Sequence, residues 1–225
     1  MKSFDVIFEK EVKITSSDAF IIIDVQNDFI PGGSLPVNKG DEIIDGINEI
    51  MSIFKNFGAK IVLSQDWHPP NHASFASVHP GLNPFDEYSS TGIGPVLWPD
   101  HCVQGQSGAE FHHKLNIKLA DVIIRKGNNP LIDSYSAFIE NDKKTKTDLP
   151  KFLKSTNIKR IFLAGLALDY CVRFTAIDGK NLGFEVYIII DLTRSIDNSE
   201  DNISSALKEM SNIGIKFIKS KTIFK

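Results

Sequence analysis

Cysteine is scarce in this chain of 225 residues, which has two, Cys102 and Cys171. A disulfide framework needs more, so the sequence excludes a small disulfide-stapled secreted domain and fits a reducing compartment. Long apolar runs are also missing, and none approaches the roughly 18 residues that span a bilayer. The first residues lack the basic and apolar regions of a secretory signal. We therefore predict a cytoplasmic protein with no membrane partner.

A charge excess is absent as well. Lysine and arginine number 25 against 28 aspartate and glutamate residues, which leaves a formal net charge of −3. Such a chain has no global positive field to attract nucleic acid or anionic lipid, so neither is an expected partner. The hydrophobic share of 42% and the charged share of 24% are ordinary for globular proteins and exclude a disordered or fibrous chain.

From residue 19 onward, short apolar runs alternate with segments of helical periodicity, which is typical of βα units. The runs are apolar at successive positions, as in a parallel sheet covered by helices on both faces. We predict an α/β fold, a three-layer α/β/α sandwich with a mostly parallel six-stranded sheet and Rossmann-like topology. Strands are expected at residues 19–24, 60–64, 121–125, 160–164, 185–190 and 215–218, and helices at 41–57, 149–155, 169–182 and 199–212.

The chain divides into an N-terminal extension, residues 1–17, and one domain, residues 18–225. In the extension, Phe4, Val6 and Phe8 occupy alternate positions, as do Val12 and Ile14, which is typical of an edge strand or hairpin packed on the domain. Two long connections, residues 65–103 and 126–147, leave the carboxyl ends of strands, where open α/β sheets bind ligands. We expect the chemistry of the protein there and at the ends of the first and fourth domain strands.

Three reactive side chains follow strand ends. Asp24 follows three isoleucines, Lys126 leaves the third domain strand, and Cys171 lies in the first turn of the helix after the fourth. A helix N-terminus lowers a thiol pKa and offers N–H groups to an oxyanion. Singly, the three have plainer interpretations: a turn aspartate, a surface lysine and an inert buried thiol. Together they indicate a nucleophile with its base and a fixed cation.

A second cluster has the ligand types of a metal site. Asp66, His68 and His72 are closely spaced, and His101 follows in the same long connection. Imidazole and carboxylate ligands suit Zn²⁺, Fe²⁺ or Mn²⁺ and leave positions open for water or substrate. We interpret Cys102 as a packing residue. The remaining histidines, interpreted as surface or loop residues, are His79, His112 and His113.

These motifs together resemble the nicotinamidase branch of the isochorismatase-like cysteine hydrolases, over roughly residues 18–195. The metal motif points to this branch, because other members keep the Asp, Lys and Cys pattern but generally lack it. The segments that carry the resemblance are residues 24–29 (DVQNDF), 32–35 (GGSL), 65–68 (QDWH) with His72, 98–103 (WPDHCV), 126–127 (KG) and 165–172 (GLALDYCV).

The resemblance implies hydrolysis of nicotinamide to nicotinate and ammonia in NAD salvage, through a cysteine thioester. It implies one divalent metal ion that orients the pyridine ring. Zn²⁺ is the first candidate for this ion, and Fe²⁺ and Mn²⁺ are the alternatives. A cis peptide bond between Leu166 and Ala167 is also implied. By position, the implied roles are catalytic for Asp24, Lys126 and Cys171, oxyanion-binding for the backbone of Ala167 and Cys171, substrate-binding for Phe29, Trp98 and Leu166, and metal-binding for Asp66, His68, His72 and His101.

Other interpretations remain open at this point. The nearest is a metal-independent isochorismatase-like hydrolase that acts on another amide or a vinyl ether, with Asp66 and the histidines merely structural. A nucleotide-binding Rossmann module is disfavoured, because no Gly-x-Gly-x-x-Gly follows the first domain strand. A metal-stabilised interaction domain without catalysis would need Asp24, Lys126 and Cys171 to coincide by chance. The sequence leaves a homo-oligomer open.

Overall fold

A six-stranded parallel sheet forms the centre of the computed structural model, which describes residues 6 and 8–224. The strands are β2 (Asp18–Ile23), β3 (Lys60–Asp66), β4 (Val122–Lys126), β5 (Arg160–Leu166), β6 (Glu185–Arg194) and β7 (Lys216–Ile218). Their order across the sheet is β4-β3-β2-β5-β6-β7, and every neighbouring pair is parallel. The predicted α/β class is thereby confirmed.

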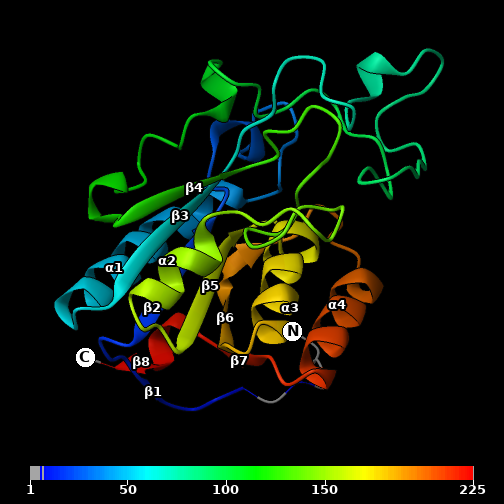
Figure 1. Cartoon of the computed structure of the whole chain (residues 1–225). Coiled ribbons are helices and arrows are strands. Elements are labelled where there is room, and N and C mark those ends of the chain that lie inside the picture. Colours follow the sequence, from blue (N-terminus) through cyan, green and yellow to red (C-terminus); the bar gives the residue numbers. More distant parts are fainter. Residues whose placement is uncertain (1–5, 7, 225) are drawn as a thin grey trace.

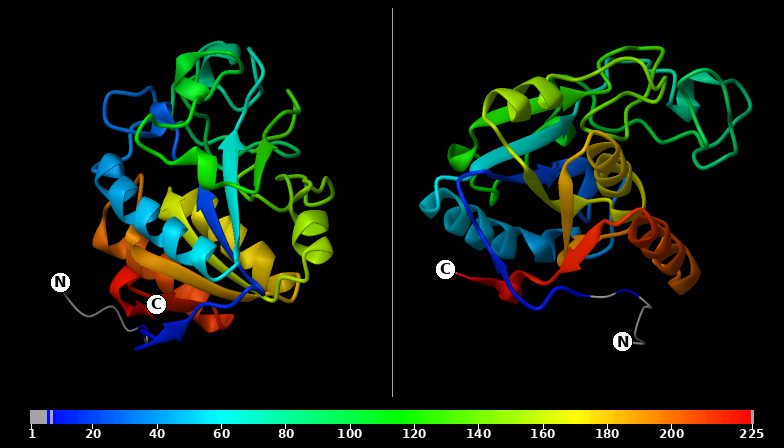
Figure 2. Two further views of the ribbon diagram at one scale, coloured as in Figure 1. Left: turned by 90° about the vertical axis from the view of Figure 1, so that its left-hand side faces the viewer. Right: turned by 60° about the horizontal axis from the view of Figure 1, so that its bottom comes forward.

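Helices cover both faces of this sheet. They are α1 (Ile44–Asn56), α2 (Leu149–Ser155), α3 (Arg173–Asn181) and α4 (Glu200–Asn212). α1 packs on β2 and β3 from one side, whereas α2 and the adjoining pair α3 and α4 lie on the other (Figures 1 and 2). The ring of Phe54 in α1 lies 5.2 Å from Phe20 and 5.1 Å from Phe162 in the sheet. These buried contacts join the layers of the predicted sandwich.

The observed elements follow the apolar runs closely, with differences at their ends. β6 extends to Arg194, and its register with β5 shifts between Leu163 and Gly165. A Cβ on Gly165 would lie 2.1 Å from the carbonyl oxygen of Ile23, so only glycine lets β5 lie this close to β2. The predicted helix at 169–182 begins as a wide π-helical turn, Leu168–Val172, and continues as α3.

Both ends of the described chain meet at one edge of the molecule. β1 (Val12–Lys13) pairs in parallel with β8 (Ile223–Phe224), and Phe8 pairs with Phe217 of β7. This pairing is parallel and joins opposite ends of the chain, so β1 is not one arm of a local hairpin. Phe4, part of the predicted alternation, lies outside the described residues.

The long connections gather at the opposite edge, beyond the carboxyl ends of the strands (Figure 2, left). They include residues 67–121 after β3 and residues 127–148 after β4. The sheet and its helices are thus a scaffold beneath one cluster of loops. Within the described residues, no helix has the length and apolar character needed to cross a membrane.

Candidate active site

A buried lysine joins the reactive side chains at the carboxyl edge of the sheet. The Nζ atom of Lys126 lies 3.0 Å from Oδ2 of Asp24 and 3.5 Å from Sγ of Cys171. It also donates to Oδ1 of Asp66 at 3.0 Å and to the carbonyl oxygen of Ser134 at 2.7 Å. Burial lowers the pKa of Lys126, but the two carboxylates outweigh it and hold this pKa well above its ordinary value. Lys126 is therefore an ammonium ion.

Asp24 is oriented by the neighbouring strand β3. Its φ of +46° is uncommon for a non-glycine residue, and its side chain is fully buried. The hydroxyl of Ser64 donates to Oδ1 at 2.6 Å and accepts a hydrogen bond from the Asp24 N–H at 3.2 Å. Oδ2 accepts no well-aligned hydrogen bond, although Lys126 is close to it. One carboxylate oxygen is thus anchored while the other is available to take a proton.

Cys171 lies in the turn between β5 and α3, and its thiol is protonated at rest. Burial raises the pKa of Cys171 well above its ordinary value, with Lys126 acting in the opposite direction and Asp24 adding to the rise. A helix N-terminus favours a lower thiol pKa, but desolvation outweighs it here and the net shift is upward. Burial also raises the pKa of Asp24, against the effect of Lys126. A raised pKa makes Asp24 a better base for the thiol proton.

Asp66, His68 and His101 form a compact group beside the cysteine. Oδ2 of Asp66 lies 3.1 Å from Nε2 of His68 and 3.4 Å from Nε2 of His101. The Nδ1 atoms lie 3.1 Å from the Gly127 carbonyl oxygen and 2.8 Å from the Pro99 carbonyl oxygen, respectively. Carbonyls only accept, so each Nδ1 carries a proton and each Nε2 lone pair faces the carboxylate. A proton or metal ion between these acceptors stabilises such an arrangement.

Gly127 makes room for this group at the end of β4. Its φ is +68°, and a Cβ there would lie 2.5 Å from Cε1 of His68. The burial of His68 lowers its pKa, but the adjacent Asp66 carboxylate outweighs this and produces a net rise in the pKa. His68 and His101 are both buried. The surrounding protein interior therefore holds both imidazoles in place, and the missing side chain of Gly127 leaves the space that the His68 ring occupies.

His72, predicted as a further metal ligand, has hydrogen-bond partners on both ring nitrogens. Its Nδ1 accepts from the Ser74 N–H at 3.2 Å and lies 2.7 Å from the Ser74 hydroxyl. Its Nε2 lies 2.8 Å from the carbonyl oxygen of Asn129 and 3.2 Å from that of Ile132. Nε2 therefore carries the proton in this arrangement. The ring stays close to His68, at 4.3 Å between centroids.

An aromatic-walled cavity opens in front of Cys171, Asp66 and His101. The indole Nε1 of Trp98 donates to the hydroxyl of Tyr135 at 3.0 Å, and that hydroxyl donates to the Gly94 carbonyl oxygen at 2.9 Å. Hydrogen bonds thus fix the Trp98 wall, and the cavity suits a planar ring. The other residues that line it are Phe29, Leu35, Asp133, Ala167, Tyr170 and Ile196.

The isochorismatase domain matches residues 18–222 of this chain. The chain belongs to the isochorismatase family. A relative in this family, the nicotinamidase of Acinetobacter baylyi, is 44% identical over 215 residues, 96% of this chain and 98% of that protein. This relative confirms the predicted nicotinamidase branch.

Two solved structures of this family are similar to the chain. PnC1 from L. infantum, in complex with nicotinate, is 38% identical with a TM-score of 0.82, covering 95% of this chain and 98% of that chain. The pyrazinamidase of Pyrococcus horikoshii, in complex with zinc, is 41% identical with a TM-score of 0.75, covering 90% of this chain and 99% of that chain. They confirm the isochorismatase-like fold.

Sequence reasoning missed three side chains at this isochorismatase-family site: Ser64, Asp133 and Tyr135. The only sign of Ser64 in the sequence is a hydroxyl-bearing residue within an otherwise apolar strand. The other two lie in the connection after β4. The length of this connection indicated a function but did not indicate which residues perform it.

Leu166, predicted to contact substrate, is fully buried, and its Cδ1 points toward Gly40. It is not among the residues that line the cavity. The peptide bond after it is cis, as the resemblance implied.

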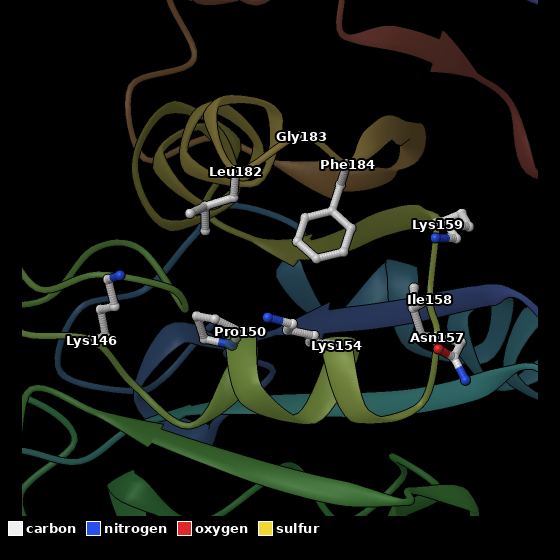
Figure 3. A pocket seen from close by; sticks show the side chains of 9 residues that line it. All are labelled: Lys146, Pro150, Lys154, Asn157, Ile158, Lys159, Leu182, Gly183 and Phe184. Carbon is white, nitrogen blue, oxygen red and sulfur yellow. The ribbon is translucent and has the colours of Figure 1, made fainter.

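A wider hollow, of about 730 Å³, lies between α2 and the turn that links α3 to β6 (Figure 3). Its polar lining consists of Lys146, Lys154, Lys159 and Asn157, beside apolar residues such as Phe184. It contains no thiol, imidazole or carboxylate, so it lacks the groups that acyl transfer requires. The smaller cavity in front of Cys171 is therefore the candidate active site.

Proposed function

We propose that this chain is a nicotinamidase, which hydrolyses nicotinamide to nicotinate and ammonia. The observation that carries the proposal is the buried contact of Asp24, Lys126 and Cys171 at one end of an aromatic-walled cavity. This arrangement supplies a nucleophile, its base and a fixed cation where a planar amide can enter. The curated relative that is 44% identical supports the choice of substrate.

In the first half-reaction, Asp24 takes the proton of the Cys171 thiol. The thiolate then attacks the carboxamide carbon, and the developing oxyanion accepts hydrogen bonds from the backbone N–H groups of Ala167 and Cys171. Each such donor is worth on the order of 3 kcal/mol in comparable sites. The carbon–nitrogen bond breaks, Asp24 gives its proton to the leaving nitrogen, and ammonia departs. A thioester to Cys171 remains.

In the second half-reaction, water hydrolyses the thioester. Asp24, again a carboxylate, takes a proton from the attacking water, and the carbon–sulfur bond breaks. The Cys171 sulfur leaves as a thiolate and recovers the proton held by Asp24. Lys126 stabilises the negative charge that passes between these two groups, because its ammonium lies 3.0 Å from Asp24 and 3.5 Å from the sulfur.

The buried charges of the site fit a divalent cation. Asp24, Asp66 and Asp133 contribute three carboxylates, and Lys126 is the only buried lysine or arginine in the described part of the chain. When all four are ionised and the imidazoles are neutral, as metal ligands are, three negative charges and one positive charge leave two uncompensated negative charges. Uncompensated buried charge is costly, and an ion of charge 2+ balances it.

We propose that Asp66, His68 and His101 hold this ion, with Zn²⁺ as the first candidate. Three protein ligands with open positions are typical of catalytic zinc sites. When bound there, the ion would act as a Lewis acid that binds the pyridine nitrogen and orients the ring. The zinc complex of the relative from Pyrococcus horikoshii supports the choice of metal.

Ammonia release from nicotinamide tests the proposed function. The wild-type protein should release ammonia, a strong chelator should reduce the release, and Cys171→Ala should abolish it. Cys102→Ala is the matched control, because Cys102 is the other buried free cysteine and should leave turnover unchanged. No release from metal-loaded wild-type protein would refute nicotinamide as the substrate. Release that survives chelation would favour the metal-independent hydrolase.

A further inference from the structure

Asp133 is a buried carboxylate that the reaction above does not use. It is 2% exposed and lines the same cavity as Cys171. The Ser134 N–H donates to its Oδ1 at 2.7 Å. Within residues 6 and 8–224, this is the one hydrogen bond that the carboxylate accepts. A buried carboxylate with a single donor is unfavourable unless another positive partner is present.

The carboxylate of Asp133 faces the predicted metal group. Its Oδ1 lies 3.9 Å from Nε2 of His68, the same nitrogen that lies 3.1 Å from Oδ2 of Asp66. Two groups of possible ligands share His68, one with Asp66 and His101 and the other with His72 and Asp133, and the ligand atoms within each group lie within 4.8 Å of one another. Asp133 is not in the group of Asp66 and His101, so it faces these ligands through His68 and lies beside the direct ligand set.

His72 holds the segment that carries Asp133. Its Nε2–H faces the carbonyl oxygens of Asn129 and Ile132, at 2.8 and 3.2 Å, and Ile132 directly precedes Asp133. Next to His72, the Ala73 N–H donates to the Pro130 carbonyl oxygen at 2.8 Å. The His72 ring thus binds the backbone of this loop with the nitrogen that a metal ion would need.

We propose that Asp133 is the second carboxylate of the cation site and that His72 is a positioning residue that holds it there. The ion then has Asp66, His68 and His101 as its ligands, and Asp133 is an outer carboxylate that faces them through His68. The inference rests on the metal role in the proposed function. It removes His72 from the ligand set that the sequence predicted, and it explains why an acidic side chain is buried in the cavity.

Zinc titration of the intact, metal-stripped protein tests this role without substrate. Competition with a fluorescent zinc indicator should show one site per chain in the wild type. Asp133→Asn keeps the side-chain shape and the oxygen that the Ser134 N–H needs, and zinc affinity should fall about 10- to 100-fold. Asp178→Asn is the matched control, because Asp178 is also a buried acid but does not line the cavity. Its zinc affinity should be unchanged.

The double variant separates positioning from direct binding. If His72 acts through Asp133, His72→Ala weakens zinc binding, and His72→Ala/Asp133→Asn binds no more weakly than Asp133→Asn alone. Losses that add, with His72→Ala as damaging as His68→Ala, would make His72 a ligand and overturn the proposal. The thermal midpoint of each metal-free variant verifies folding, and Asp133→Ser provides a second test of the carboxylate.

The remaining outcomes separate this inference from the proposed function. Wild-type affinity in both Asp133→Asn and Asp133→Ser would overturn the role of Asp133 and leave the nicotinamidase proposal intact. A wild-type chain that binds no zinc, Fe²⁺ or Mn²⁺ would overturn the metal role and this inference with it. Ammonia release by that same chain would still support the cysteine chemistry of the proposed function.

Discussion

Replacing Ser64 with alanine removes the hydroxyl that anchors Asp24 from the neighbouring strand. Two hydrogen bonds are lost, the donation to Oδ1 at 2.6 Å and the acceptance from the Asp24 N–H at 3.2 Å. Both groups are buried, and a hydrogen bond to a charged group contributes about 1.5–3 kcal/mol. The free energy of unfolding should fall by that amount, which corresponds to a midpoint about 3–12 °C lower.

Turnover should fall together with stability, because the freed carboxylate no longer presents Oδ2 to the thiol. If the stabilisation of the transition state falls by the same free energy, kcat falls about 10- to 100-fold. The pH profile should also move. The Ser64 hydrogen bond lowers the pKa of Asp24, so its loss raises that pKa. Since Asp24 acts as a base, the acidic limb of kcat should shift to higher pH in Ser64→Ala.

The assay is ammonia release from saturating nicotinamide across pH, with urea unfolding on the same samples. Ser77→Ala is the matched control, because the Ser77 hydroxyl also donates to an aspartate, Asp100, at 2.6 Å, but in an exposed position. That variant should lose less than about 1 kcal/mol and keep its pH profile. Wild-type kcat and an unshifted acidic limb in Ser64→Ala would refute the positioning of Asp24 by Ser64.

Three further predictions follow from the same contacts. Lys126→Met leaves Asp24 and Asp66 buried without their ammonium partner, so the free energy of unfolding should fall by about 3–5 kcal/mol in urea titration and turnover should be lost; unchanged stability would contradict this. Tyr135→Phe removes the acceptor of the Trp98 indole, and the KM for nicotinamide should rise about tenfold with kcat nearly constant; a KM within twofold of the wild type would argue against that role. Iodoacetamide labelling of Cys171, followed by mass spectrometry, should still accelerate above pH 9, because burial raises the pKa of this thiol; a plateau below pH 8 would show a low thiol pKa instead.

Most of the scaffold could be predicted from local patterns. Strands such as β2 are buried along their whole length, so they read as continuous apolar runs and reveal a parallel sheet. The ends of parallel strands meet at one edge, which is why Asp24, Lys126 and Cys171 could be brought together before any contact was known. The pairing of β1 with β8 could not be predicted, because it joins two-residue strands from opposite ends of the chain.

The metal group shows where local reasoning stops. His72 and His101 look equivalent in the sequence, since both lie in one histidine-rich connection near Asp66. Their difference depends on what faces each ring. His101 turns Nε2 toward Asp66, whereas His72 turns Nε2 toward the Asn129 carbonyl, 57 residues away along the chain. No spacing rule contains that information.

The sequence by itself determined where along the chain the apolar runs form strands. It also determined the three reactive residues at the strand ends and the kinds of ligand beside them. These properties depend on residue type and short-range periodicity. Only the tertiary structure decided that Ser64 holds Asp24, that Asp133 faces His68, and that the Cys171 thiol is protonated at rest. Each of these depends on burial and on partners from distant segments, because hydrogen bonds and pKa values are set by the surroundings of a side chain and not by its neighbours in sequence.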